Sequence, residues 1–199
     1  MVVTALKTQV KNPERVSIFL DNKYSFSLSL DELVKYKLKQ GDELTTGDEK
    51  KFKKISADGK LRARALEWLL NRPHSEREFR DYLYRKKAEP EQIEKLVEEF
   101  GQKHYLDNSK FAEWFTELQA RRGKSNRAIR SELAAKGISR ELISDTLDSA
   151  EQDESQRIKQ VIEKKSKNSR YKKDPLKLKQ YLAQKGFSYD LINETLKNT

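Results

Sequence analysis

The chain contains only two histidines, the side chains best suited to acid–base or metal chemistry near neutral pH, and no cysteine that could act as a nucleophile. His74 and His104 have no HxH, HExxH or paired acidic motif around them, so a metal site would need ligands from elsewhere in the chain. His74 lies in the turn Pro73-His74-Ser75, where we expect an exposed loop residue. We therefore predict no metal site and no bound cofactor.

Other catalytic arrangements are equally hard to find. The acid pair Glu98-Glu99 is expected on an exposed helix rather than in an apolar pocket that could raise a pKa. Gly123, Gly137 and Gly186 occupy turn and helix-end positions, so they do not form a phosphate-binding loop. Since no serine follows a strand in a nucleophile elbow either, we predict that the protein is not an enzyme.

A tandem repeat is the strongest pattern in the chain. Residues 133–147 and 182–196 are identical at nine of fifteen positions, at a constant offset of 49 residues. Residues 75–97 carry the same skeleton more weakly, at an offset of 50. A period near 50 residues indicates a copied supersecondary unit, and stacked units present a surface rather than a pocket.

The first 28 residues predict three short antiparallel strands, at residues 2–10, 15–20 and 24–28. We expect Asn12-Pro13-Glu14 to form the first turn. Ser29 and Glu32 have the spacing of a capping box, which predicts a helix from Leu30 to about Lys39 that stops at Gly41. Because three strands and one helix have little core of their own, we expect this part to pack against the helices after it or to be mobile.

From about Asp48 onward the apolar spacing is helical. Ser75, Ser125, Ser139, Asp174 and Ser188 are expected to cap helices. The predicted fold is mainly α: three tandem three-helix repeats in an elongated array, preceded by a small β-meander and a short helix. The predicted boundaries are a β-rich domain at 1–47 and helical repeats at 48–107, 108–154 and 155–199.

Charge is concentrated in particular segments. The chain holds 42 Lys+Arg against 32 Asp+Glu, for a formal net charge of +10. Seven basic residues and one acid lie between Arg121 and Arg140, and eleven basic residues and two acids between Gln156 and Gly186. Solvated helices with ordinary ion pairs would explain either segment alone. If the repeats stack, however, their middle helices align into one basic stripe suited to phosphates or to an acidic protein groove.

Tyrosines accompany some of this charge. Tyr82 shares a face with Phe79 and Leu83, so we expect it in the core. The roles of Tyr84 and of Tyr171, within the basic insertion, stay open; exposed rings there could stack on bases.

Several spaced motifs resemble the RecX family of recombinase regulators: residues 104–112 (HYLDNSKFA), 121–125 (RRGKS), Ile129, Glu132-Leu133 and Lys136-Gly137-Ile138. The resemblance runs from about Leu61 to Leu196, and the first strands look like the extension of longer members. Asn108 stands where the family usually has a second Asp. The resemblance implies a protein that binds the RecA recombinase filament on single-stranded DNA and restrains its ATPase, strand-exchange and co-protease activities.

On this basis we expect the filament or its DNA to be contacted by basic side chains of the middle helices, of adjoining turns and of the basic insertion. They are Arg85, Lys86, Lys87, Arg121, Arg122, Lys124, Arg127, Arg130, Lys136, Lys164, Lys165, Lys167, Arg170, Lys172 and Lys173. The main alternative is a helical-repeat DNA-binding protein that acts without RecA, although the acidic third helices disfavour insertion into a major groove. A scaffold for another ATPase is a third possibility.

The sequence also leads to expectations about the protein's location and its assembly state. No apolar run approaches the roughly 20 residues that a transmembrane helix needs. The N-terminus lacks the features of a signal peptide. We expect a soluble, cytoplasmic monomer without membrane contact.

Overall fold

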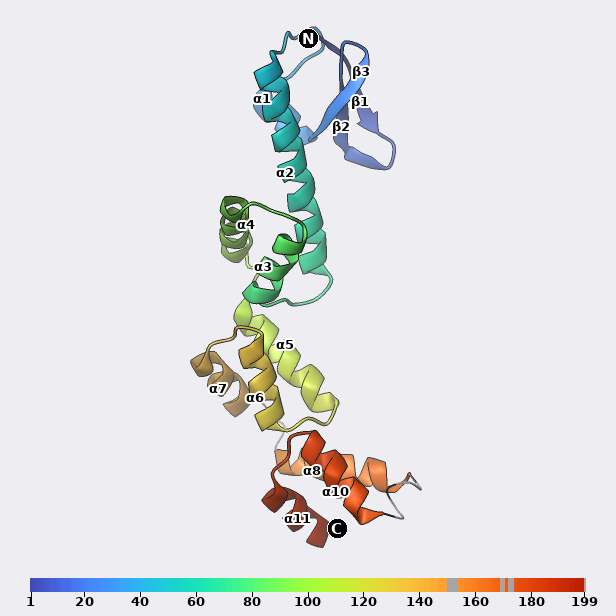
Figure 1. Cartoon of the computed structure of the whole chain (residues 1–199), viewed down its shortest axis with the longest axis vertical. Coiled ribbons are helices and arrows are strands. Elements are labelled where there is room, and N and C mark those ends of the chain that lie inside the picture. The colour runs from blue at the N-terminus through green and yellow to red at the C-terminus, as the bar shows by residue number, and fades with distance from the viewer. Residues whose placement is uncertain (150–153, 169–170, 172–173, 199) are drawn as a thin grey trace. The chain divides into compact units, whose positions relative to one another are not determined.

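The structure is a computed structural model that describes residues 1–149, 154–168, 171 and 174–198 (Figure 1). It divides into two compact units. The N-terminal unit comprises Met1–Trp68 and Lys86–Leu96. The C-terminal unit comprises Leu69–Arg85 and Val97–Thr199. The predicted fold class is confirmed, with helices dominating and a three-stranded antiparallel sheet at the N-terminus.

The sheet has the strand order β1-β2-β3, with β1 at Val3–Gln9, β2 at Asn12–Leu20 and β3 at Lys23–Ser29. The predicted turn at Asn12-Pro13-Glu14 is wrong, because the chain turns at residues 10–11 and these three residues begin β2. The pairing of β1 with β2 is irregular between Thr8 and Gln9. This irregularity accommodates Pro13, which has no N–H to donate to a neighbouring strand.

Helix α1 at Leu30–Tyr36 begins with the predicted capping box of Ser29 and Glu32. It ends earlier than expected, at Lys37, which adopts a left-handed conformation with φ 51°. Gly41 then reaches back to the sheet, where its N–H donates to the carbonyl of Val3 over 2.9 Å.

The sheet packs against a later helix, as expected. Helix α2 at Thr46–Leu70 contributes Phe52, whose ring stacks on that of Phe26 at 5.4 Å between centroids. Tyr36 of α1 meets the same Phe52 ring edge-on at 5.6 Å. A helix that the sequence assigns to the first repeat therefore completes the small N-terminal core.

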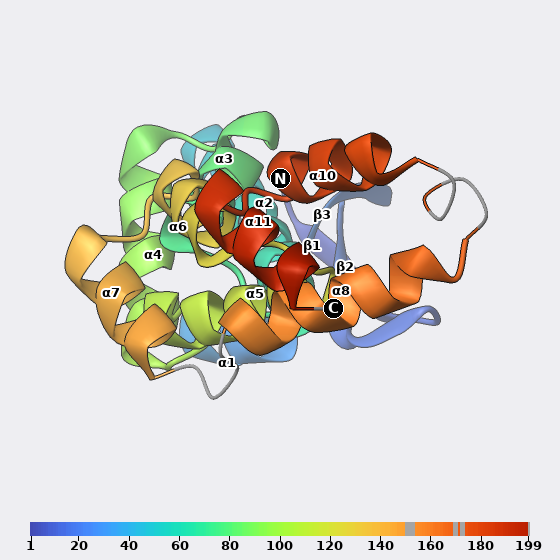
Figure 2. The ribbon, with the colours of Figure 1, turned by 90° about the horizontal axis from the view of Figure 1, so that it is seen from below.

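The remaining helices follow the predicted plan. Their bounds are α3 Glu76–Arg85, α4 Pro90–Gln102, α5 Asn108–Arg121, α6 Asn126–Ala135, α7 Arg140–Asp148, α8 Glu154–Ser166, α10 Pro175–Gln184 and α11 Tyr189–Lys197. We call α5–α7 the second repeat, α8, α10 and α11 the third repeat (Figure 2), and α3, α6 and α10 the middle helices.

Local signals at the helix ends behave as expected. The side chains of Ser125, Ser139, Asp174 and Ser188 each accept a hydrogen bond from a backbone N–H in the first turn of the following helix. Ser75 Oγ does the same for the N–H of Glu78 over 3.1 Å. These contacts satisfy N–H groups that have no partner inside the helix.

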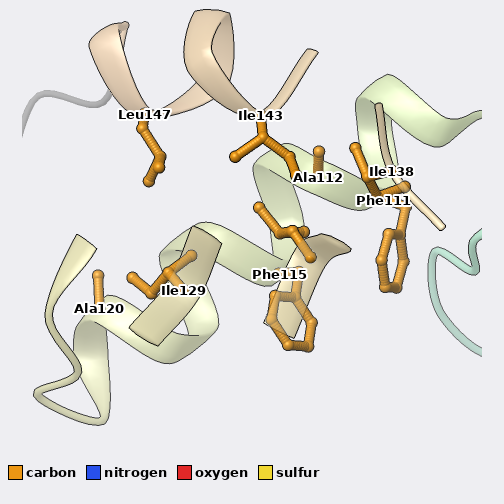
Figure 3. Close-up of a cluster of buried hydrophobic side chains, with 9 residues drawn as sticks. Phe111, Ala112, Phe115, Ala120, Ile129, Ile138, Ile143 and Leu147 are labelled. Carbon is orange, nitrogen blue, oxygen red and sulfur yellow. The ribbon is translucent and has the colours of Figure 1, made fainter. Parts of the chain in front are cut away.

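Each C-terminal repeat has its own apolar core. In the second repeat, Phe111 and Phe115 of α5 meet Ile129 of α6 and Ile143 of α7 (Figure 3). In the third repeat, Ile158 and Ile162 of α8 pack with buried residues of α10 and α11. Both are thin cores, typical of stacked repeats that bury further surface against their neighbours.

Within the described residues, no helix is long and apolar enough to cross a membrane.

Candidate interaction surface along the middle helices

Glu78 of α3 organises a contact with the second repeat. Its carboxylate lies 2.7 Å from Lys136 Nζ, 3.0 Å from Arg72 Nη1 and 3.3 Å from His74 Nδ1. Burial alone would raise the pKa of Glu78. Hydrogen bonds from His74, Lys136 and Arg72 outweigh burial and hold the pKa well below its ordinary value. Glu78 is therefore an anion at neutral pH, surrounded by Arg72, Lys136 and His74.

Two further contacts complete this first junction. The N–H of Glu76 donates to Asn108 Oδ1, at the start of α5, over 2.9 Å. Arg77 covers Gly137, so that a Cβ on Gly137 would lie 3.1 Å from Arg77 Cβ. The N-terminal turn of α3 thus rests on both the start of α5 and the end of α6.

The second junction joins the second and third repeats in the same way. The N–H of Asn126 donates to Glu154 Oε1, at the start of α8, over 2.7 Å. Arg127 Nε donates to the carbonyl of Gly186 over 3.1 Å, and the N–H of Ser125 donates to the carbonyl of Lys185 over 3.0 Å. Here the N-terminal turn of α6 rests on the start of α8 and the end of α10.

The two junctions use equivalent positions with different chemistry. Arg77 and Arg127 meet Gly137 and Gly186 respectively, at the repeat's own offsets of 50 and 49. The position of Glu78 is taken by Ala128 in the next repeat, and an alanine side chain cannot form the ionic contact that Glu78 makes. In both cases the start of one middle helix meets the end of the next, and α3, α6 and α10 follow one another end to end (Figure 1).

Several side chains expected at the interaction surface are engaged within the chain. Four of them form ion pairs: Arg121 with Glu117, Lys124 with Glu132, Lys136 with Glu78, and Lys167 with Glu163. Arg127, although exposed, belongs to the second junction.

The other expected contact residues divide into three groups. Arg85, Lys87, Arg122, Arg130 and Lys164 are exposed and have no side-chain partner among the described residues. Lys86 is exposed, and Lys165 lies over the rings of Tyr171 and Tyr181. The third group, outside the described residues, comprises Arg170, Lys172 and Lys173.

The prediction that His74 is an exposed loop residue is wrong, because its side chain is 4 % exposed and contacts Glu78. It lines a hollow of about 250 Å³ together with His104, Tyr105, Asp107 and Lys110. In the part of the chain that the structure describes, no group of three His, Asp or Glu side chains is placed to hold a metal ion.

The sequence did not identify Arg157 as a structurally important residue. Arg157 of α8 is 3 % exposed, and its Nη1 donates to the carbonyl of Lys124 over 3.0 Å and to Asn126 Oδ1 over 2.9 Å. In the sequence it is one of eleven basic residues in a charged segment. The repeat alignment does not indicate that Arg157 is buried, although it does place Arg77 and Arg127 at equivalent positions.

Family models match nearly the whole chain. Residues 1–45 match the regulatory protein RecX N-terminal domain, and residues 62–100, 107–147 and 151–196 match the first, second and third RecX three-helix domains.

Curated relatives and solved structures agree with these models. Proteins called Regulatory protein RecX are 34% identical in Listeria monocytogenes (96% of this chain and 73% of the relative), 35% in Bacillus velezensis (99% and 77%) and 34% in Bacillus subtilis (98% and 75%). A crystal structure of regulatory protein RecX superposes with a TM-score of 0.71 at 23% identity, covering 100% of this chain and 99% of the other. The crystal structure of RecX from Lactobacillus salivarius gives 0.58 at 23% identity, over 71% and 95%.

Proposed function

Because this chain belongs to the RecX family of regulatory proteins, we propose that it binds RecA recombinase filaments on single-stranded DNA and inhibits their ATPase, strand-exchange and co-protease activities. It does so as a cytoplasmic monomer, through binding rather than catalysis.

The observation that carries this proposal is the succession of middle helices. Their ends meet at two equivalent junctions, so exposed cations on neighbouring helices lie along one connected scaffold. Arg130 on α6 and Arg122 in the turn before it are exposed and have no carboxylate partner among the described residues. Such cations can pair with acidic side chains of a filament or with its phosphates without first breaking an internal ion pair.

Binding to the assembled filament tests the proposal. RecA is loaded on single-stranded DNA with a non-hydrolysable ATP analogue, and the anisotropy of the fluorescently labelled protein is followed as filament is added. We expect Arg122→Ala with Arg130→Ala to weaken binding about ten-fold or more, since two charge contacts are lost. Arg127 is left unchanged, because it donates to Gly186 and its loss would disturb the junction.

A matched control removes the same charge elsewhere. Lys95 on α4 and Lys103 directly after it are exposed and paired with Glu91 and Glu99 respectively. Replacing both lysines with alanine should leave filament binding near the wild-type value. Equal weakening by both double variants would mean that net charge alone acts and would contradict a specific surface on the middle helices.

A further inference from the structure

Two lysines of the third repeat approach tyrosine rings instead of carboxylates. Lys165 Nζ of α8 lies 4.7 Å from the ring centre of Tyr181 and 5.6 Å from that of Tyr171. Lys185 Nζ lies 5.5 Å from the ring centre of Tyr181. The two rings are 5.6 Å apart. We call these four residues the lysine–tyrosine cluster.

The two lysines of the cluster have no carboxylate partner among the described residues. Within the described part of the chain, neither Lys165 nor Lys185 forms an ion pair, whereas Lys167 on one side and Lys177 on the other pair with Glu163 and Asp174. Two ammonium groups that share one aromatic ring repel each other, and the ring compensates them only weakly. The arrangement therefore favours an anion from outside the chain.

The positive charge continues beyond the cluster. Lys185 Nζ donates to the carbonyl of Arg122 over 3.1 Å, which brings the turn before α6 to the edge of the third repeat. The Arg122 side chain there is exposed, as is Lys164 beside Lys165. An extended polyanion would meet several cations in succession, whereas a single small anion would meet only the cluster.

We propose that the lysine–tyrosine cluster binds single-stranded DNA directly, with the lysines on phosphates and a tyrosine ring stacked on a base. A base that stacks on a ring face covered by a lysine displaces that ammonium group, and the lysine then moves from the ring to a phosphate. In duplex DNA the base faces are already stacked, which restricts the tyrosine contribution to single strands. An acidic protein segment would account for the lysines but not for two adjacent rings. The biological setting of this contact rests on the proposed function, since the RecA filament is where the protein would meet single strands.

The lysines are tested by the salt dependence of DNA binding with RecA absent. Binding of fluorescein-labelled oligothymidylate to the full chain is measured by anisotropy at several salt concentrations. We expect Lys165→Ala with Lys185→Ala to reduce the slope of log K against log salt by about 1.4, since each phosphate contact on a single strand contributes about 0.7. Lys167→Ala with Lys177→Ala removes the same net charge from ion-paired positions and should reduce the slope far less. Equal slopes for the two double variants would overturn the proposal.

The ring is tested by two substitutions at Tyr181. Tyr181→Phe should bind oligothymidylate like wild type, whereas Tyr181→Leu should bind about ten-fold more weakly, because stacking is lost. Since Tyr181 packs against the third core, the melting temperature of both variants is measured by circular dichroism. If Tyr181→Leu is folded and binds oligothymidylate normally, or loses the same affinity for duplex DNA, base stacking is excluded.

These outcomes separate the inference from the proposed function. Wild-type protein that inhibits RecA but does not bind oligothymidylate on its own would overturn the inference alone. DNA binding that depends on the cluster, with no effect on RecA, would support the inference and contradict the proposed function.

Discussion

Lys136 Nζ lies 2.7 Å from Glu78 Oε1, although the two residues are 58 positions apart in the sequence. This contact joins α3 to the end of α6. Arg127 makes the corresponding link from α6 to Gly186 at the end of α10, but through a backbone carbonyl. The two junctions therefore share a geometry and differ in how they respond to changes of charge.

Neutralising Glu78 should destabilise the protein. Glu78→Gln leaves Arg72 and Lys136 facing a neutral amide, and we expect a loss of about 1–3 kcal/mol in the free energy of unfolding, measured by urea denaturation. The control is Glu91→Gln, which removes a fully exposed helical pair with Lys95. That change should lower the free energy of unfolding far less, because an exposed ion pair is screened by solvent and contributes little. Equal losses in the two variants would show that Glu78 stabilises the protein no more than an ordinary surface ion pair does.

The same carboxylate should make stability depend on pH. Its folded pKa is lowered from 4.5, so its contribution is complete above the unfolded pKa and is lost as the pH falls below it toward the folded value. The stability difference between wild type and Glu78→Gln should therefore be constant near neutral pH and shrink below about pH 4.5. Thermal unfolding of both proteins from pH 7 to pH 3 measures this difference. A gap that stays constant to pH 3 would contradict the ionic description.

Gly186 should be intolerant of a side chain. Its φ is +96°, and an added Cβ would lie 2.7 Å from Ala128 Cβ. We expect Gly186→Ala to cost about 2–4 kcal/mol through strain and overpacking at the second junction. Gly41→Ala is the matched control, because Gly41 has φ +95° with open space around it. Thermal unfolding measures how much more stability Gly186→Ala loses than Gly41→Ala, and this difference reports the steric clash at the second junction. Equal losses in the two variants would mean that the junction relaxes around the added methyl group with little loss of stability.

Sequence reasoning succeeded where the determining interactions are local. Ser125 and Ser188 cap their helices by contacts three residues away, and Gly137 adopts the expected positive φ of 81°. Tyr82, placed in the core by its helical spacing with Phe79, is buried.

It failed where the determining partner is distant. His74 is buried and contacts Glu78, which also binds Lys136, 58 residues further along the chain; no local pattern predicts that long-range contact. Arg127 counts as a surface cation in the sequence but binds a carbonyl 59 residues away. The boundaries after residues 47, 107 and 154, and the set of partner-contacting residues, stay predictions.

The rate of ATP hydrolysis by RecA on single-stranded DNA tests the central claim most directly. Wild-type protein is titrated into the steady-state reaction at low and moderate salt. We predict a dose-dependent fall in the rate that saturates and is weakened in the Arg122→Ala, Arg130→Ala variant. An unchanged or increased rate at protein concentrations that saturate the filament would contradict the account.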